Sequence, residues 1–106
     1  MPYKRRARVL FVADGSEAAL ACACAQRLGA DWLDPSADKS PPSAATLAWA
    51  DLVVSLDDSA QATMPSLPPN ARHVHWHIAG HDEIERRMLG MIGGMRLLSR
   101  NLEDPT

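Results

Sequence analysis

One apolar run near the start of the chain constrains the fold most. Val9 to Ala13 are all apolar, which is typical of a strand covered on both faces in the middle of a parallel sheet. The run enters a tight acidic turn, and 18–28 is then predicted to be an alanine-rich helix with Gly29 as its C-cap. Asp14 is expected to be the N-cap of this helix, with Glu17 completing a capping box.

The rest of the chain continues the alternation of strands and helices. Strands are predicted at 31–34, 52–56 and 72–78, and helical segments at 44–50, 57–64 and 82–102. The segment 35–43 holds three prolines and three serines and is predicted to be a loop. We therefore expect one domain over 1–106, an α/β three-layer fold with a small parallel sheet of about four strands flanked by helices. Ligands of such folds bind at the carboxyl ends of the strands, where the first turn lies.

The last predicted helix carries one apolar stripe and several glycines. The stripe recurs at helical spacing and is expected to face the sheet; it consists of Ile84, Met88, Met91, Met95 and Leu98. Gly90, Gly93 and Gly94 each weaken a helix by about 0.5–1 kcal/mol relative to alanine, so they suggest close approach of another backbone. The pattern leaves three readings open: packing onto the sheet, a helix-to-helix dimer contact, and a bent or frayed helix.

Composition excludes some classes of function. The formal net charge of −2 gives no overall attraction to nucleic acid, so no nucleic-acid partner is predicted. The first apolar run stops after five residues, too short for a signal peptide, and no stretch approaches the roughly 18 apolar residues of a membrane span. A cytoplasmic protein is expected. Cys22 and Cys24 point in nearly opposite directions on a helix, so they cannot bridge and are expected to be reduced core residues.

Three segments, taken in order and spacing, resemble a known family. They are "RVLFV" (8–12) leading into a glycine-containing turn, "WADLVVSLDD" (49–58) and "LPPNARHVHWHI" (67–78). Together they resemble the low-molecular-weight protein tyrosine phosphatases and the related arsenate reductases, and most closely the short bacterial predicted tyrosine phosphatases. The resemblance implies the phosphatase fold over most of the chain.

The resemblance also implies a Cys-x5-Arg loop between the first strand and the first helix, in which a thiolate attacks phosphorus and the arginine grips the phosphate oxygens. This sequence places Ala13 and Ala19 at those two positions. Gly15 matches the glycine of the family, whereas Ser16 and Leu20 replace its usual asparagine and its serine or threonine. No catalytic residue is therefore predicted in this degenerate loop, which comprises Ala13, Asp14, Gly15, Ser16, Glu17, Ala18, Ala19 and Leu20.

Two further features of the family's site are altered. The family's general acid is an aspartate shortly after the late-strand tryptophan; here Gly80 and His81 stand near that place, with Asp82 slightly beyond. In the turn, Asp14 and Glu17 place two carboxylates where an anion would bind. Two carboxylates at about 4 Å from a bound phosphate would weaken its binding by an amount on the order of several kcal/mol in a partly dry site. The loop is therefore predicted to be closed to anions.

Histidines are the main candidates for metal binding. His73, His75 and His77 are predicted to share one face of a strand, and His81 follows. Alternating histidines can bind Zn, Ni or Cu, but neighbours on one strand face lie about 6.5–7 Å apart, which is wide for a shared ion. Histidines that hydrogen-bond or cover the sheet edge are the expectation. For Asp57 and Asp58, N-capping is favoured over a metal pair.

These observations predict a phosphatase-like protein without the catalytic cysteine and arginine, which needs no cofactor and acts by binding another protein. A homodimer through the last helix is one form of that contact. One alternative is an enzyme or small-molecule binder that uses the same cleft with Asp14, Ser16, Glu17 and the histidines. A serine nucleophile at Ser16 lacks a base and an oxyanion hole nearby in sequence. The other alternative is metal binding through His73, His75, His77 and His81.

Overall fold

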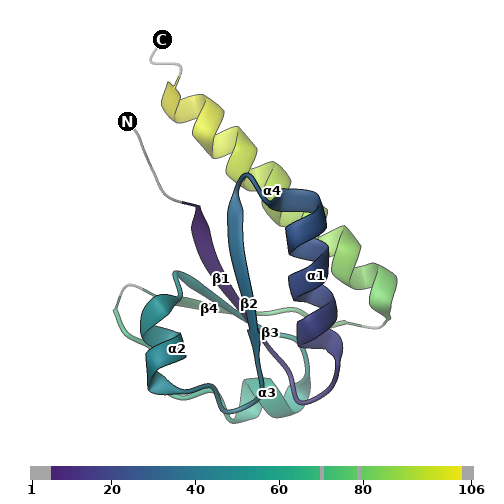
Figure 1. The fold of residues 1–106 in the computed structure, drawn as a ribbon, viewed down its shortest axis with the longest axis vertical. Helices are drawn as coiled ribbons and strands as arrows, with labels where there is room; N and C mark the ends of the chain where they lie inside the picture. The colour runs from purple at the N-terminus through teal and green to yellow at the C-terminus, as the bar shows by residue number, and fades with distance from the viewer. Residues whose placement is uncertain (1–5, 70, 79, 104–106) are drawn as a thin grey trace.

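In the part of the chain that the structure describes, four strands alternate with four helices (Figure 1). The computed structural model describes residues 6–69, 71–78 and 80–103, with the backbone alone at position 81 and over 95–103. The four strands form one parallel sheet. The elements, in chain order, are β1 (Ala7–Val12), α1 (Glu17–Gly29), β2 (Leu33–Asp38), α2 (Ala44–Trp49), β3 (Leu52–Ser55), α3 (Asp58–Ala62), β4 (Arg72–His75) and α4 (His81–Glu103).

The sheet has the order β2-β1-β3-β4 and is covered on both faces. Val9 and Phe11 of β1 belong to an apolar cluster with residues of α1 and α4, whereas Leu10 and Val12 belong to a second cluster with residues of α2 and α3. Alternate side chains of one strand thus enter opposite layers, which is why the run 9–13 contains no polar residue. The predicted three-layer α/β fold with a four-stranded parallel sheet is confirmed (Figure 1).

Elements with strong local signals lie where the sequence predicts them. β1 is the central strand, paired with β2 on one side and β3 on the other. The hydroxyl of Ser43 accepts a hydrogen bond from the Thr46 backbone N–H at 3.2 Å, so it caps α2. Asp57 caps α3 in the same way, through the Ala60 N–H at 2.7 Å. These two helices are short, and their caps determine where they begin.

The predicted loop over 35–43 is wrong in its first part, because β2 extends through Pro35 to Asp38. Pro35 lies opposite Val9, and Asp38 lies opposite Val12. A proline has no backbone N–H, but β2 is an edge strand, where that loss leaves no ladder partner unmet. Pairing with β1 therefore outweighs the local loop signal. In the opposite direction, β4 ends at His75 rather than at residue 78.

Gly29 is the last residue of α1 rather than its C-cap, which is Ala30 with a helical φ of −57°. Close packing around position 29 explains why a glycine is found there. A Cβ at Gly29 would lie 2.7 Å from Cδ1 of Ile92 and 3.3 Å from Cδ1 of Leu33. The absence of a side chain lets α4 pack closely over the end of α1.

The glycines of α4 do not mark a close approach within the described part of the chain, so the reading that they pack onto the sheet is wrong, whereas the dimer reading stays a prediction. A Cβ at Gly90, Gly93 or Gly94 would meet no atom within 4 Å. The helix packs through Ile84, Met88 and Ile92, so Ile92 takes the place predicted for Met91, which is only partly buried. Met95 and Leu98 of the predicted stripe lie outside the residues whose side chains are described. Among the described residues, no helix combines the length and hydropathy that crossing a bilayer requires.

The two kinds of glycine predict opposite effects of alanine. Gly29→Ala is expected to lower the free energy of unfolding by about 1 kcal/mol, because buried Ile92 must shift. Gly90→Ala is expected to raise it by about 0.5–1 kcal/mol, because open space surrounds an exposed helical position. Urea unfolding followed by circular dichroism measures both. Equal effects of the two substitutions would contradict the close packing of α4 on α1.

Candidate functional site

The carboxyl ends of β1, β3 and β4 meet at one edge of the sheet, which we call the carboxyl edge. From β1 the chain goes to β2 on one side, and it then crosses to β3 on the other side of β1. The two connections diverge between β1 and β3, which is where parallel sheets form a ligand crevice. The segments at this edge are 13–16 after β1, 56–59 after β3 and 76–78 after β4.

The first two of these segments are tied together by Asp57. Its Oδ2 accepts a hydrogen bond from the Asp14 backbone N–H at 2.8 Å, while its Oδ1 caps α3. In return, the Ser59 hydroxyl donates to the Asp14 carboxylate. The crevice position between β1 and β3 is therefore bridged by protein groups.

These contacts overturn the predicted capping box of Asp14 and Glu17. The helix α1 begins at Glu17, its N-cap is Ser16, and the Ser16 side chain makes no capping hydrogen bond. Ser16 itself has helical dihedral angles, φ −79° and ψ −5°. Asp14 does not cap α1 because its backbone N–H and its carboxylate are both engaged with the β3–α3 turn.

Glu17 instead folds back onto the turn. A Cβ at Gly15 would lie only 2.5 Å from its Oε1, so the carboxylate rests directly against the glycine. That oxygen is buried and has no hydrogen-bond partner among the described residues. A carboxylate in this place repels an incoming anion. The expected repulsion of anions by the turn therefore comes from Glu17 and does not need a capping box.

The positions that would carry phosphatase chemistry hold small or apolar side chains. Ala13 is buried in the apolar cluster between the sheet and the helices α1 and α4, Ala19 is exposed, and Leu20 is 39% exposed. The two cysteines lie further along α1, where Cys24 is buried and Cys22 is partly buried. Burial raises the pKa of both thiols, which disfavours the thiolate that nucleophilic attack requires.

The predicted common face of His73 and His75 is confirmed by their contacts with Ser55. The buried Ser55 hydroxyl lies 2.9 Å from Nε2 of His73 and 2.8 Å from Nδ1 of His75. Burial, and then the neighbouring His75, lower the pKa of His73 below its ordinary value. On the opposite face, Trp76 packs against Phe11 with ring centroids 6.0 Å apart.

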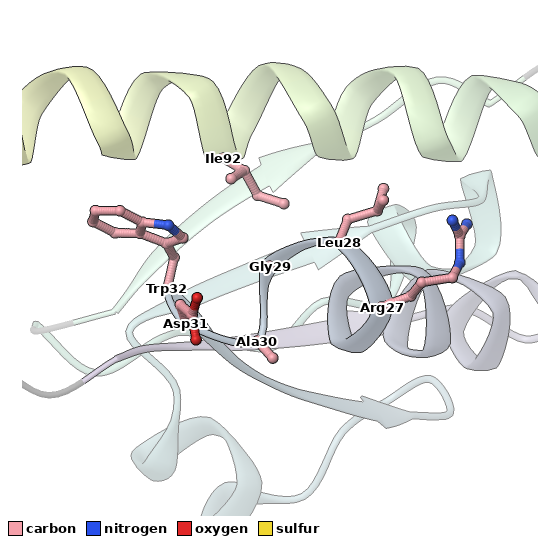
Figure 2. Close-up of a pocket in the computed structure, with 7 residues that line it drawn as sticks. All are labelled: Arg27, Leu28, Gly29, Ala30, Asp31, Trp32 and Ile92. Carbon is pink, nitrogen blue, oxygen red and sulfur yellow. The ribbon is translucent and has the colours of Figure 1, made fainter.

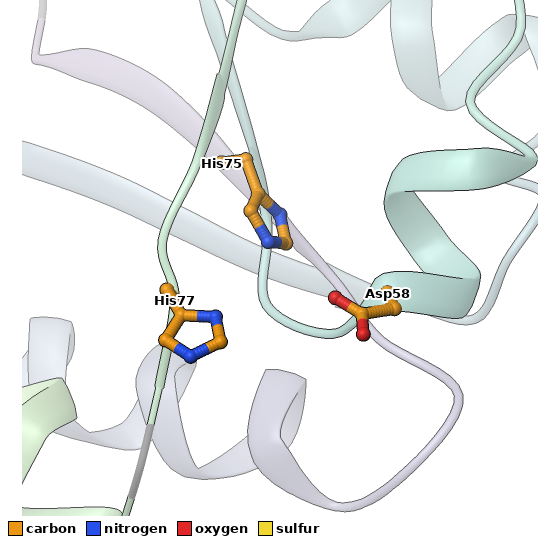
Figure 3. A group of neighbouring side chains, drawn as sticks. All are labelled: Asp58, His75 and His77. Carbon is orange, nitrogen blue, oxygen red and sulfur yellow. The ribbon is translucent and has the colours of Figure 1, made fainter.

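Of the four histidines predicted as metal ligands, His75 and His77 come together. Asp58, which the sequence assigns to N-capping, lies beside them. One ligand atom from each of Asp58, His75 and His77 lies within 4.8 Å of the others (Figure 3). The ideal strand spacing that argued against a shared ion does not apply, since β4 ends at His75 and His77 lies beyond its end. His73 turns to Ser55 instead, and the side chain of His81 lies outside the described residues.

Sequence reasoning missed Asp58 as a partner of the histidines, and it did not single out Ser55. Both lie at the carboxyl end of β3, and Ser55 is opposite His75 in the register of β3 and β4. The signal was therefore topological: polar residues that end adjacent parallel strands meet at one edge. Asp82, considered as a general acid, lies in the first turn of α4 with its side chain exposed.

A hollow lies at the amino edge of the sheet, opposite the carboxyl edge (Figure 2). It has a volume of about 310 Å³ and lies between the end of α1, the start of β2 and α4. Arg27, Asp31 and Trp32 are among the residues that line it. It is far from the strand ends at which ligands of this class of sheet bind, and we assign it no role.

Comparisons with known proteins identify the fold. No family model and no curated protein sequence matches the chain. Among solved structures, the thioredoxin-dependent arsenate reductase of Corynebacterium glutamicum is similar, with a TM-score of 0.73 and 13% sequence identity. The match covers 87% of this chain and 62% of that protein, so this chain spans less than two thirds of its length. The chain therefore has the fold of the low-molecular-weight phosphatases and arsenate reductases.

Proposed function

We propose that this chain is a non-catalytic protein of the low-molecular-weight phosphatase fold, which acts by binding another protein. The observation that carries the proposal is the identity of two residues. Alanine stands at positions 13 and 19, where the resemblance requires a nucleophilic cysteine and a phosphate-binding arginine. Without the thiol, no covalent phosphoryl or arsenate chemistry of that type can begin.

The surroundings of the turn support the same proposal. Glu17 lies against Gly15, and Asp57 holds the Asp14 N–H that an anion would otherwise accept from. Neither Cys22 nor Cys24 offers a substitute, because both lie within α1 and have raised pKa values. The fold is retained, so selection for a binding surface is the simplest reason for keeping it.

A second copy of the chain is the partner we propose first, with α4 as the contact. Leu89 is 52% exposed on this helix. Open space next to Gly90, Gly93 and Gly94 would let another helix approach closely. Light scattering is expected to give twice the chain mass of 11.5 kDa, and Leu89→Lys is expected to return it to the single mass. A single mass for the unaltered protein would leave a different protein as the partner.

Copurification of the untagged protein from its native cells tests the binding role itself. The expected result is one protein recovered in stoichiometric amount, either a second copy or a different chain. Recovery of a small molecule in the crevice instead, with no protein partner, would favour the alternative of a small-molecule binder that uses Asp14, Ser16 and Glu17.

Restoring the two missing residues is expected not to restore catalysis. The double variant Ala13→Cys/Ala19→Arg should release p-nitrophenol from p-nitrophenyl phosphate no faster than the unaltered chain, because the Glu17 carboxylate still opposes the anion. Adding Glu17→Gln is expected to increase phosphate binding by the double variant, with phosphate titration as the measurement. Robust turnover by the double variant alone would refute the electrostatic argument.

A further inference from the structure

We propose that Asp58, His75 and His77 form a binding site for a divalent transition-metal ion, such as Zn²⁺, at the carboxyl edge of the sheet. Asp58 comes from the start of α3, His75 from the end of β4 and His77 from the segment after it, and the three side chains face a common space (Figure 3). Their ligand atoms lie within 4.8 Å of one another. This inference is independent of the proposed partner binding.

Small side-chain rotations would bring the three atoms to coordination distance. Ligand atoms around a tetrahedral Zn²⁺, with bonds of about 2.0–2.2 Å, lie roughly 3.3–3.6 Å apart. Asp58 and His77 are exposed and His75 is partly buried, so no packed core has to yield when they move. Two imidazoles and one carboxylate are a ligand set that suits Zn²⁺ and its neighbours in the transition series.

Ser55 fixes the ring of His75 in a suitable orientation. Its hydroxyl lies 2.8 Å from Nδ1 of His75 and 2.9 Å from Nε2 of His73, and it is fully buried. A single hydroxyl can accept from one of these nitrogens while it donates to the other. When it accepts from Nδ1–H of His75, Nε2 of that ring is left with a lone pair for a metal ion. Ligating histidines characteristically donate their second ring N–H in this way.

Asp58 is available because its neighbour performs the structural role. Asp57 caps α3 and holds the Asp14 N–H, whereas the Asp58 carboxylate makes no hydrogen bond or ion pair with the described residues. Asp57 and Asp14 also add negative charge to this edge, and Asp14 is joined to α3 through Ser59. The negative charges of nearby carboxylates attract a cation to this edge.

The three protein ligands leave a fourth position to solvent. Zinc sites with three protein ligands keep this position open for water or another molecule, unlike closed structural sites with four. A bound ion would also join the start of α3 to the segment after β4 by coordinate bonds. The conformation of the surface formed by the start of α3 and the segment after β4 would then depend on the bound ion.

Calorimetric titration of the full chain with ZnSO4 at pH 7.5 tests the site. We expect one ion per chain with a Kd below about 100 μM. Asp58→Asn, His75→Gln and His77→Gln are each expected to weaken binding at least about tenfold, with unchanged circular dichroism. Asp31→Asn removes the same charge at the opposite edge of the sheet and is expected to leave the Kd unchanged.

Two more variants exclude other zinc ligands. His73→Gln is expected to retain binding, since His73 faces Ser55 rather than the cluster. Cys22→Ala/Cys24→Ala is expected to retain it as well. The proposal is overturned if no ion binds below about 100 μM, if the three cluster variants bind Zn²⁺ as tightly as the unaltered chain, or if removing the cysteines abolishes binding.

Discussion

Replacing Phe11 with alanine is expected to lower the free energy of unfolding by about 3–5 kcal/mol, which is the usual cost of removing a buried aromatic ring. Phe11 is 0% exposed in the central strand β1. Its ring lies 6.0 Å from that of Trp76 at an interplanar angle of 54°, so it joins the first strand to the segment after the last one. No neighbour can fill the space without moving the sheet.

Urea unfolding followed by circular dichroism measures this effect. Because a domain of this size has about 5–15 kcal/mol of stability, the variant is expected to unfold at a much lower urea concentration with an unchanged slope. Leu20→Ala is the matched control, since Leu20 is 39% exposed and lies outside the proposed α4 contact, and its effect is expected to stay within about 0.5 kcal/mol. A Phe11→Ala variant as stable as the control would contradict the packing described for the α1 and α4 layer.

Asp57→Ala is expected to have the second largest effect, a loss of about 2 kcal/mol in the free energy of unfolding. One carboxylate oxygen caps α3 through the Ala60 N–H, and the other accepts the Asp14 N–H from the β1–α1 turn. The substitution removes both hydrogen bonds together. It also separates the two turns that meet at the switch point of the sheet.

Asp57→Asn is the control that divides these two contributions. An asparagine can still cap α3 through its carbonyl oxygen, but its amide nitrogen cannot accept the Asp14 N–H. We therefore expect roughly half of the loss seen with alanine, measured by the same urea unfolding. An asparagine variant as unstable as the alanine variant would show that the charge, rather than the hydrogen bonds, holds the turns.

The sequence predicts those elements whose cause is local. The apolar run from Val9 to Ala13 identifies a doubly covered strand, and Ser43 and Asp57 each mark the start of a helix. The errors arise where a distant segment decides the outcome. Pro35 lies in a strand because β1 pairs with it, and Asp14 is drawn away from α1 by Asp57, 43 residues later in the chain.

The candidate site divides in the same way. Alanine at positions 13 and 19 can be read directly from the sequence, and the loss of a cysteine and an arginine there, which the resemblance implies, stays a prediction. The approach of Asp58 to His75 and His77 depends on the pairing of β3 with β4 and on the end of β4 at His75, neither of which a local pattern contains. Spacing along an ideal strand predicted that the histidines would stay apart.

Turnover of p-nitrophenyl phosphate by the unaltered chain tests the central claim most directly. Incubation at pH 5 to 7 is expected to release p-nitrophenol no faster than buffer alone, because the first turn holds no cysteine and the Glu17 carboxylate lies against Gly15. Release above that background, if abolished by Ser16→Ala or Asp14→Asn, would contradict the account and show that this turn is an active site with a different chemistry.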